Sequence, residues 1–202
     1  MIVQWVIKGI DGSMPSGIDR QQAIYIANTS GILSNWFRAY SSIPIDQFDT
    51  KLTRANLDHH VNNYAQVRSE TPFISLTAGN VERDAYTQTN RILPAKRIAL
   101  EFATSNGQHP GFLFFCWVIA GLKPAVRVEG LSEQVRDLTT YQRYSPYQLE
   151  GEITAKIRIP SNQIQRVEQY DPEVGFSQPT WQYQNIGFTT PDTVSNLREF
   201  II

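Results

Sequence analysis

Two glutamates separated by a single residue, Glu150 and Glu152, are the residues of this sequence best suited to chemistry. They open a stretch, 150–159, in which polar residues alternate strictly with apolar or small ones, and a period of two predicts a half-buried strand. Pro160 ends that strand. Side chains two residues apart on a strand share a face, so we expect the carboxylates about 6 to 7 Å apart. Such a pair favours a cationic ligand or a developing positive charge. The alternative is an edge strand with a solvated acidic end.

The composition limits the class of protein that carries this pair. The chain has 202 residues, of which 41% are hydrophobic and 18% charged, so we expect a single packed domain over 1–202. The net charge is −1 and no run of Lys or Arg exceeds a pair, which argues against a dedicated nucleic-acid binder. The one cysteine, Cys116, lies in an apolar run and is expected in the core. Because the sequence has only one cysteine and three histidines, a zinc site made of Cys and His ligands is not expected.

The amino-terminal stretch 1–12 has neither a basic region before its apolar residues nor a small-residue cleavage site. We therefore expect no signal peptide and no membrane span, and a cytoplasmic location, although a toxin delivered by a secretion machine would have the same appearance. Residues 1–10 are predicted to form a first strand. A helix is predicted from Asp19, its N-cap, to a stop at 28–31.

Arg38 lies among aromatic residues in the stretch 32–40, ILSNWFRAY, which we predict to be a strand. Its side chain is either a snorkelling surface residue or a guanidinium aimed into a cleft to bind a phosphate or carboxylate.

After a turn, residues 48 to 66 predict one helix with His59 on its inner stripe. His59 and His60 are expected at the helix surface or rim rather than as ligands.

Two hydroxyls alternate with apolar residues in the stretch 71–79, TPFISLTAG. This pattern predicts a short strand with Ser75 and Thr77 on one face and Ile74 and Leu76 on the other. The hydroxyls are either ordinary strand residues or a hydrogen-bonding shelf beside a ligand.

The remaining chain predicts the elements that would surround these strands. Residues 80–90 are polar and rich in turn formers, and we interpret them as a mobile connection. A helix opens at Pro94 with a face of small residues, and the apolar run 112–120 is predicted to be a central strand buried on both faces. The polar stretch 130–146 leads to the glutamate strand. The Pro- and aromatic-rich extension 161–202 is expected to lie pinned across the body.

Three tyrosines spaced by three, Tyr141, Tyr144 and Tyr147, precede the glutamate strand. A tyrosine-rich loop beside a site is suited to substrate contacts, because each ring offers contact area and a hydroxyl at a small entropic cost. The alternative is that these rings pack on the core.

The order of these motifs, an arginine strand (WFRAY), a hydroxyl strand (PFISLTAG) and a strand with E-x-E (EGE), resembles the R-S-E class of ADP-ribosyltransferases. That class includes cholera-toxin-like enzymes and arginine-specific transferases. The resemblance covers about residues 32 to 160. The middle motif of the family is commonly S-T-S, whereas this chain has Ser75, Leu76 and Thr77.

The resemblance implies an α/β (α+β) fold with a core of two packed, mainly antiparallel sheets, flanking helices and an NAD cleft between the sheets. It implies NAD as substrate and no metal. Glu152 would hold the ribose and stabilise the oxocarbenium-like cation, and Ser75 would orient Glu152. Arg38 would bind the phosphates of NAD, with Thr77 beside the cofactor.

The resemblance also implies how the acceptor is used. Glu150 would position or deprotonate the accepting group, because E-x-E goes with arginine acceptors in this family. The loop 141–149, with Tyr144 and Tyr147, would recognise the acceptor. We therefore expect a mono-ADP-ribosyltransferase that modifies a protein, with nucleic acid less favoured. The alternatives are an NAD glycohydrolase with water as acceptor and a non-catalytic binding module.

Overall fold

The computed structural model describes residues 2–40, 46–83, 87, 89–120, 135–137, 151–192 and 195–202. The strands are β1 Ile2–Asp11, β2 Ile32–Leu33, β3 Phe73–Thr77, β4 Asn80–Arg83, β5 Asn90–Leu93, β6 Gly111–Ala120, β7 Val135–Asp137, β8 Glu152–Lys156, β9 Arg158–Ile159, β10 Ile164–Tyr170, β11 Trp181–Gln184 and β12 Ser195–Asn196. The helices are α1 Arg20–Tyr25, α2 Asn35–Ala39, α3 Asp46–Lys51, α4 Arg54–Asn62, α5 Tyr64–Val67 and α6 Ala95–Ala103, with a π-helical turn η1 Ile26–Ser30 and a 3₁₀ turn η3 Ser161–Gln163.

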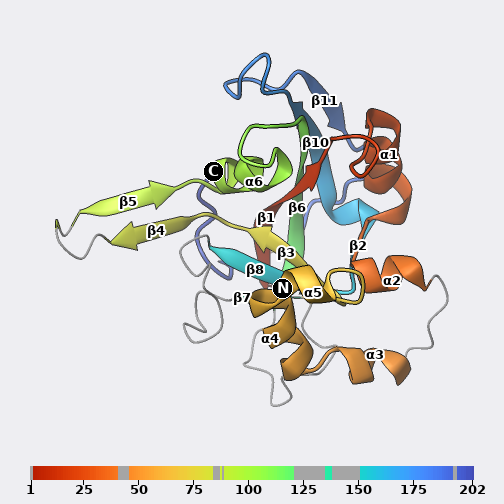
Figure 1. Ribbon diagram of the computed structural model, residues 1–202. Coiled ribbons are helices and arrows are strands. Elements are labelled where there is room, and N and C mark those ends of the chain that lie inside the picture. The colour runs from red at the N-terminus through yellow and green to blue at the C-terminus, as the bar shows by residue number, and fades with distance from the viewer. Residues whose placement is uncertain are drawn as a thin grey trace.

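These elements form a mixed α/β fold with mainly antiparallel sheets, as the sequence predicts (Figure 1). The large sheet has the order β11-β10-β6-β1-β3-β8-β7, with β12 beside β1, and two small ribbons are formed by β2 with β9 and by β4 with β5. Among the described residues, no helix is long and apolar enough to cross a membrane.

The centre of the large sheet is β6, which pairs with β1 on one side and β10 on the other. Its residues 111–118 are all buried, so the predicted central strand is confirmed, as is a core position for Cys116. Ala23 and Ala27 from α1 and η1 belong to the cluster on one face, and the small residues of α6 pack on the other. Helix α6 approaches β1 closely at Gly9, which has no side chain. A Cβ at Gly9 would lie 2.4 Å from the Ala99 carbonyl oxygen.

The sheet consists of two parts that are joined at one residue pair. β1 and β3 pair where Ile7 lies opposite Thr77, whereas β1 pairs with β6 along its whole length. Where two antiparallel sheets were predicted, the structure has one large sheet with two antiparallel parts. One part is formed by β11, β10, β6 and β1, and the other by β3, β8 and β7. The residues around this junction come from both parts.

The opening helix agrees with the sequence. The Asp19 side chain accepts a hydrogen bond from the Gln22 amide and the Gln22 side chain accepts one from the Asp19 amide, which is a capping box. The helical segment ends at Gly31, whose φ of 69° suits glycine. The α6 helix also matches, except that Pro94 is its N-cap residue instead of its first helical residue.

The predicted strand over 32–40 is wrong beyond Leu33, because residues 35–39 form helix α2. Ser34 has an extended backbone, and its Oγ accepts a hydrogen bond from the Phe37 amide at 3.3 Å, which caps the helix. The cap outweighs the strand preference of the aromatic residues, and Trp36 reaches the core from the helix instead.

The single helix predicted over 48–66 is divided into α3, α4 and α5. Thr53 interrupts it with an extended backbone and caps α4 by accepting from the Asn56 amide at 3.2 Å. Asn63 then lies between α4 and α5. Because each break rotates the following helix, the inner stripe predicted for one continuous helix does not hold.

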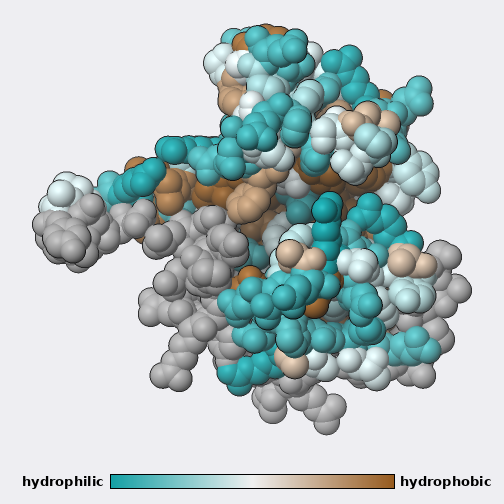
Figure 2. Space-filling model, viewed as in Figure 1, coloured by the Kyte–Doolittle hydropathy of each residue, from teal (hydrophilic) through white to brown (hydrophobic). Residues whose placement is uncertain are grey.

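The connection predicted over 80–90 contains a β-ribbon, in which β4 and β5 pair antiparallel and project from the body (Figure 1). Val81 and Ile92 lie opposite each other and are 46% and 60% exposed. Figure 2 shows apolar surface where this ribbon meets the body.

The glutamate strand is shorter and more deeply buried than the alternation predicts. β8 ends at Lys156 because Ile157 has a φ of 63°, which breaks the strand before β9. Residues 151–157 are all buried, so the expected half-buried strand is wrong for the polar face.

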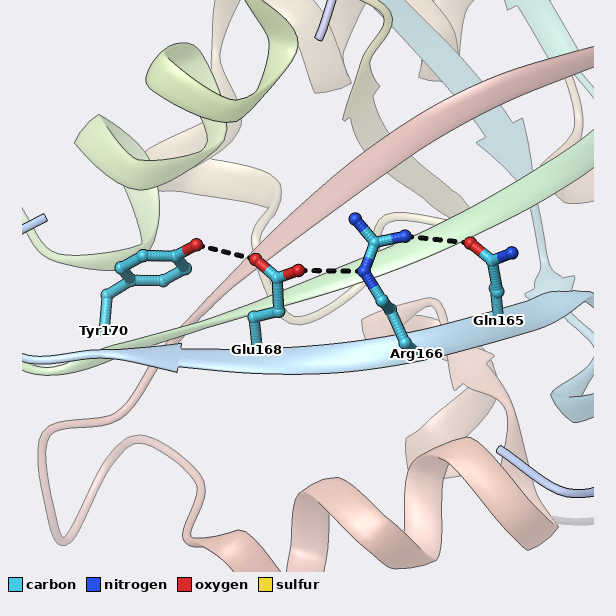
Figure 3. A network of polar contacts seen from close by, with 4 residues as sticks. All are labelled: Gln165, Arg166, Glu168 and Tyr170. Atoms are coloured by element: carbon cyan, nitrogen blue, oxygen red, sulfur yellow. Dashed lines mark hydrogen bonds and ion pairs between the residues drawn. The ribbon is translucent and has the colours of Figure 1, made fainter. Parts of the chain in front are cut away.

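The stretch after Pro160 contributes to the sheet. β10 pairs with β6 in the large sheet, and its side chains Gln165, Arg166, Glu168 and Tyr170 form a chain of hydrogen bonds (Figure 3). The segment 195–202 is pinned across the body, as predicted, through β12 and further backbone hydrogen bonds.

Candidate functional site

The predicted hydroxyl strand and the glutamate strand are neighbours in the sheet. Thr77 lies directly opposite Glu152, and Ser75 lies directly opposite Thr154. Residues directly opposite each other in a sheet point to the same face, so these four polar side chains form one group. Glu152 is 9% exposed and Thr154 is fully buried. The Thr154 hydroxyl has no hydrogen-bond partner in the described part of the chain.

His60 on α4 lies against this group and hydrogen-bonds two hydroxyls. Its Nε2 is 2.9 Å from Ser75 Oγ, and its Nδ1 is 2.7 Å from Thr71 Oγ1. The side chain is buried, 3% exposed, and burial lowers its pKa to about 4, helped by the positive charge of Lys8. The imidazole is therefore neutral at physiological pH, and it holds the Ser75 hydroxyl in place.

The expectation that His60 lies at the surface or rim is wrong. The spacing of Leu57, His60 and Val61 would have placed His60 on the inner face of a helix that is capped by Thr53 and begins at Arg54. The assumption of one helix from residue 48 placed His59 there instead, and His59 is exposed.

Lys8 is a further charged residue of the site that the sequence analysis does not select. It follows Ile7, the residue that joins the two parts of the sheet. Burial lowers the pKa of Lys8 to about 8; the negative charge of Glu152 opposes this shift and the positive charge of Arg38 adds to it. Lys8 is the only charged residue in the mainly apolar stretch 2–10, and a charge in such a strand was the signal for its role.

Arg38 lies at the rim of this region, on helix α2 instead of a strand. Its side chain is exposed and donates to the Asn35 side-chain oxygen. It borders a hollow of about 460 Å³ whose other lining residues are Asn35, Ala65, Gln66, Arg68 and Ser69. The positive charge of Arg38 contributes to the lowered pKa of Lys8.

The remaining predicted site residues, Glu150, Tyr144 and Tyr147, lie outside the described residues. The residue between the two glutamates is described. Gly151 has a φ of 60°, and its carbonyl oxygen accepts from the Ala78 amide at 3.2 Å. A Cβ at Gly151 would lie 2.0 Å from the Gly79 carbonyl oxygen, so a side chain does not fit there.

These groups define a site with both signs of charge. Glu152 supplies a buried carboxylate that can stabilise a cation, and Lys8 supplies an ammonium that can bind an anion. The Ser75 hydroxyl, held by His60, adds a hydrogen-bonding group on the same sheet face as Glu152. The arrangement is therefore suited to a substrate that carries phosphate and develops positive charge elsewhere.

No protein-family model matches this chain, and no curated protein matches it. Solved structures with a similar arrangement include EcPltA, with 15% identity, a TM-score of 0.48, and coverage of 98% of this chain and 94% of that one. The catalytic domain of the mosquitocidal toxin from Bacillus sphaericus has 13% identity, a TM-score of 0.48, and coverage of 97% and 65%. A mutant of E. coli heat-labile enterotoxin has 12% identity, a TM-score of 0.46, and coverage of 91% and 76%. At these identities and TM-scores, none of these structures defines the activity of this chain.

Proposed function

We propose that this protein is an NAD-dependent mono-ADP-ribosyltransferase. One observation carries the proposal: a buried glutamate, Glu152, is aligned across two strands with a hydroxyl shelf held by a neutral histidine. The hydroxyl motif and Glu152 of the E-x-E motif thus fall on adjacent strands, whereas the arginine motif lies on helix α2. Lys8 takes the place we assigned to Arg38 as the inner phosphate-binding cation, and Arg38 serves at the entrance.

The reaction begins when the bond between ribose C1′ and the nicotinamide nitrogen breaks, and nicotinamide leaves with the electron pair. Positive charge then develops on the ribose, and the Glu152 carboxylate stabilises it in a site with little water. The Ser75 hydroxyl, fixed by His60, orients Glu152. The Lys8 ammonium binds the pyrophosphate and keeps C1′ at the carboxylate.

Transfer is completed when a nucleophile forms a bond to C1′ and loses its proton. We assign a protein arginine as the acceptor and Glu150 as the group that takes the proton, on the resemblance of E-G-E to arginine-specific members. Tyr144 and Tyr147 would contact the acceptor protein. NAD is a substrate in this scheme, and no metal takes part.

The test is nicotinamide release from NAD by wild type and by Glu152→Gln, which removes the charge and almost nothing else. We expect release to fall at least about a hundredfold, in line with a loss of about 3 kcal/mol of transition-state stabilisation. Glu101→Gln, a change at an exposed glutamate of α6, is the control and is expected to leave release unchanged. If wild type releases no nicotinamide and NAD does not raise its melting temperature, the protein is a binding module instead.

A second variant separates transfer from hydrolysis. Glu150→Gln is expected to abolish modification of an arginine-containing protein or of agmatine while NAD is still cleaved. If wild type cleaves NAD but modifies neither acceptor, and Glu150→Gln cleaves NAD at the wild-type rate, water is the acceptor and the protein is an NAD glycohydrolase.

A further inference from the structure

The segment 195–202 lies along the edge of β1 that β3 leaves unpaired. β12 pairs in parallel with the start of β1, where Ile2 lies opposite Ser195. The Leu197 amide then donates to the Val3 carbonyl oxygen at 2.8 Å, and the Arg198 amide donates to the Gln4 side-chain oxygen at 2.9 Å. The backbone of Arg198 is therefore held at the junction of the two parts of the sheet.

The same segment also holds the residues that follow β3. The Ile201 amide donates to the Ala78 carbonyl oxygen at 3.0 Å, and the Ile201 carbonyl oxygen accepts from the Ala95 amide at 2.6 Å. Ala78 in turn donates its amide hydrogen to the Gly151 carbonyl oxygen. Segment 195–202 thus connects the end of β3 and the start of α6 to Gly151, the residue before Glu152.

The Arg198 guanidinium reaches the centre of this arrangement. It donates to the Gly79 carbonyl oxygen, and that oxygen lies 2.0 Å from the place of a Cβ at Gly151. Arg198 Nη2 lies 3.2 Å from the same place. The guanidinium and the Gly79 carbonyl therefore both lie against Gly151, the residue between Glu150 and Glu152.

From these contacts we propose that Arg198 is a positioning residue for Glu152, acting through Gly79 and Gly151. This inference rests on the proposed function, because it concerns the reaction of the same site. A glycine at φ 60° has few restraints of its own, and the contacts around it must hold the following carboxylate in place. A shift of about 1 Å in a catalytic group can cost about a hundredfold in rate.

The experiment compares Arg198→Met with Arg198→Lys, and Arg97→Met at an exposed arginine of α6 serves as the matched control. We measure kcat and KM for nicotinamide release, the melting temperature, and hydrogen exchange of the Ala78 amide. Arg198→Met is expected to lower kcat at least about tenfold and to leave KM for NAD within about twofold, because its contact is with the backbone. Lysine, which keeps a charged donor, is expected to restore most of kcat, and the control to equal wild type.

Exchange of the Ala78 amide is expected to be faster in Arg198→Met than in Arg97→Met, because its acceptor, the Gly151 carbonyl, is less well held. A wild-type kcat in Arg198→Met overturns the inference, and a raised KM at constant kcat shows that Arg198 binds NAD instead. If wild type releases no nicotinamide, the proposed function fails. Unchanged exchange of the Ala78 amide in Arg198→Met would then refute the structural part as well. Should Arg198→Met not fold, Arg198→Gln provides the same comparison.

Discussion

The Lys8 ammonium is a charge that a small rise in pH removes, because burial lowers the pKa of Lys8 to about 8. Above that pH the site loses its inner cation, so we expect kcat/KM for nicotinamide release to fall as pH rises through about 8. This parameter reports the ionisation of the free enzyme. Lys8→Arg, whose guanidinium stays protonated, is expected to keep kcat/KM level to about pH 10. Identical pH profiles for wild type and Lys8→Arg would show that Lys8 does not bind the substrate.

The neutral state of His60 affects stability in acid. Its pKa is lowered to about 4 in the folded chain, so between pH 6.5 and 4 the unfolded chain binds more protons. Stability therefore rises with pH in this window and is lost as pH falls. Between pH 7 and pH 5 we expect wild type to lose about 2 kcal/mol more unfolding free energy than His60→Gln. Urea denaturation at both pH values measures this, and equal losses would contradict a buried neutral His60.

At the same scale, the residues of the site differ in how far the sequence predicts them. Ser75, Thr77 and Glu152 could be selected because the alternation that aligns them is local to each strand. Lys8 and His60 carry weaker signals, because their roles depend on the pairing of β1 with β3 and on a helix that is capped by Thr53 and begins at Arg54. Arg38 was selected for its aromatic neighbours, and the Ser34 cap turns its segment into a helix at the rim.

At the scale of elements, the turn into β8 depends on a glycine between the glutamates. Gly151→Ala would impose a φ of 60° on alanine and place its Cβ against the Gly79 carbonyl. We expect a loss of about 2 kcal/mol in unfolding free energy and a fall in nicotinamide release of at least about a hundredfold. Thermal denaturation and the release assay measure both effects.

Gly175→Ala is the matched control for this substitution. Gly175 has a φ of 91°, but a Cβ there would meet no atom within 4 Å. It carries the backbone strain without the collision, so it is expected to cost about 1 kcal/mol and to leave nicotinamide release unchanged. Equal effects of the two variants would mean that the contact of Gly151 with Gly79 has no role in the site.

The elements themselves were predictable where the signal is local and strong. The apolar run of β6 and the small-residue face of α6 require no knowledge of their partners. The β4–β5 ribbon was missed because the polar residues of 80–90 give no alternation, and its strands are stabilised by pairing with each other. The burial of the polar face of β8 was missed for a related reason, since it depends on the packing of segments that are distant in the sequence, such as α4 against the neighbouring strand β3.

At the scale of the whole molecule, β10 carries the buried ionic network shown in Figure 3. Glu168 accepts from Arg166 Nε at 2.8 Å and from the Tyr170 hydroxyl at 2.6 Å, and its side chain is 8% exposed. Glu168→Ala leaves the Arg166 charge and the Tyr170 hydroxyl without this partner. We expect a loss of about 3 kcal/mol in unfolding free energy, measured by urea denaturation.

The exposed pair formed by Arg97 and Glu101 on α6 provides the comparison for Glu168→Ala. Its side chains are about half exposed, so Glu101→Ala is expected to change the unfolding free energy by less than about 0.5 kcal/mol. Similar losses for the two variants would show that the network on β10 adds no more than a surface ion pair.

The position of β1 also determines when the protein can fold during its synthesis. β1 precedes its partners in the chain, which are β6 on one side and, on the other, β3 at a single residue pair and the late segment that contains β12. Contacts between residues so far apart in sequence form slowly, and the ribosome delivers them late. β1 therefore has no full-length partner until residues 111–120 have been translated, and a chaperone that binds extended apolar segments would engage it in that interval.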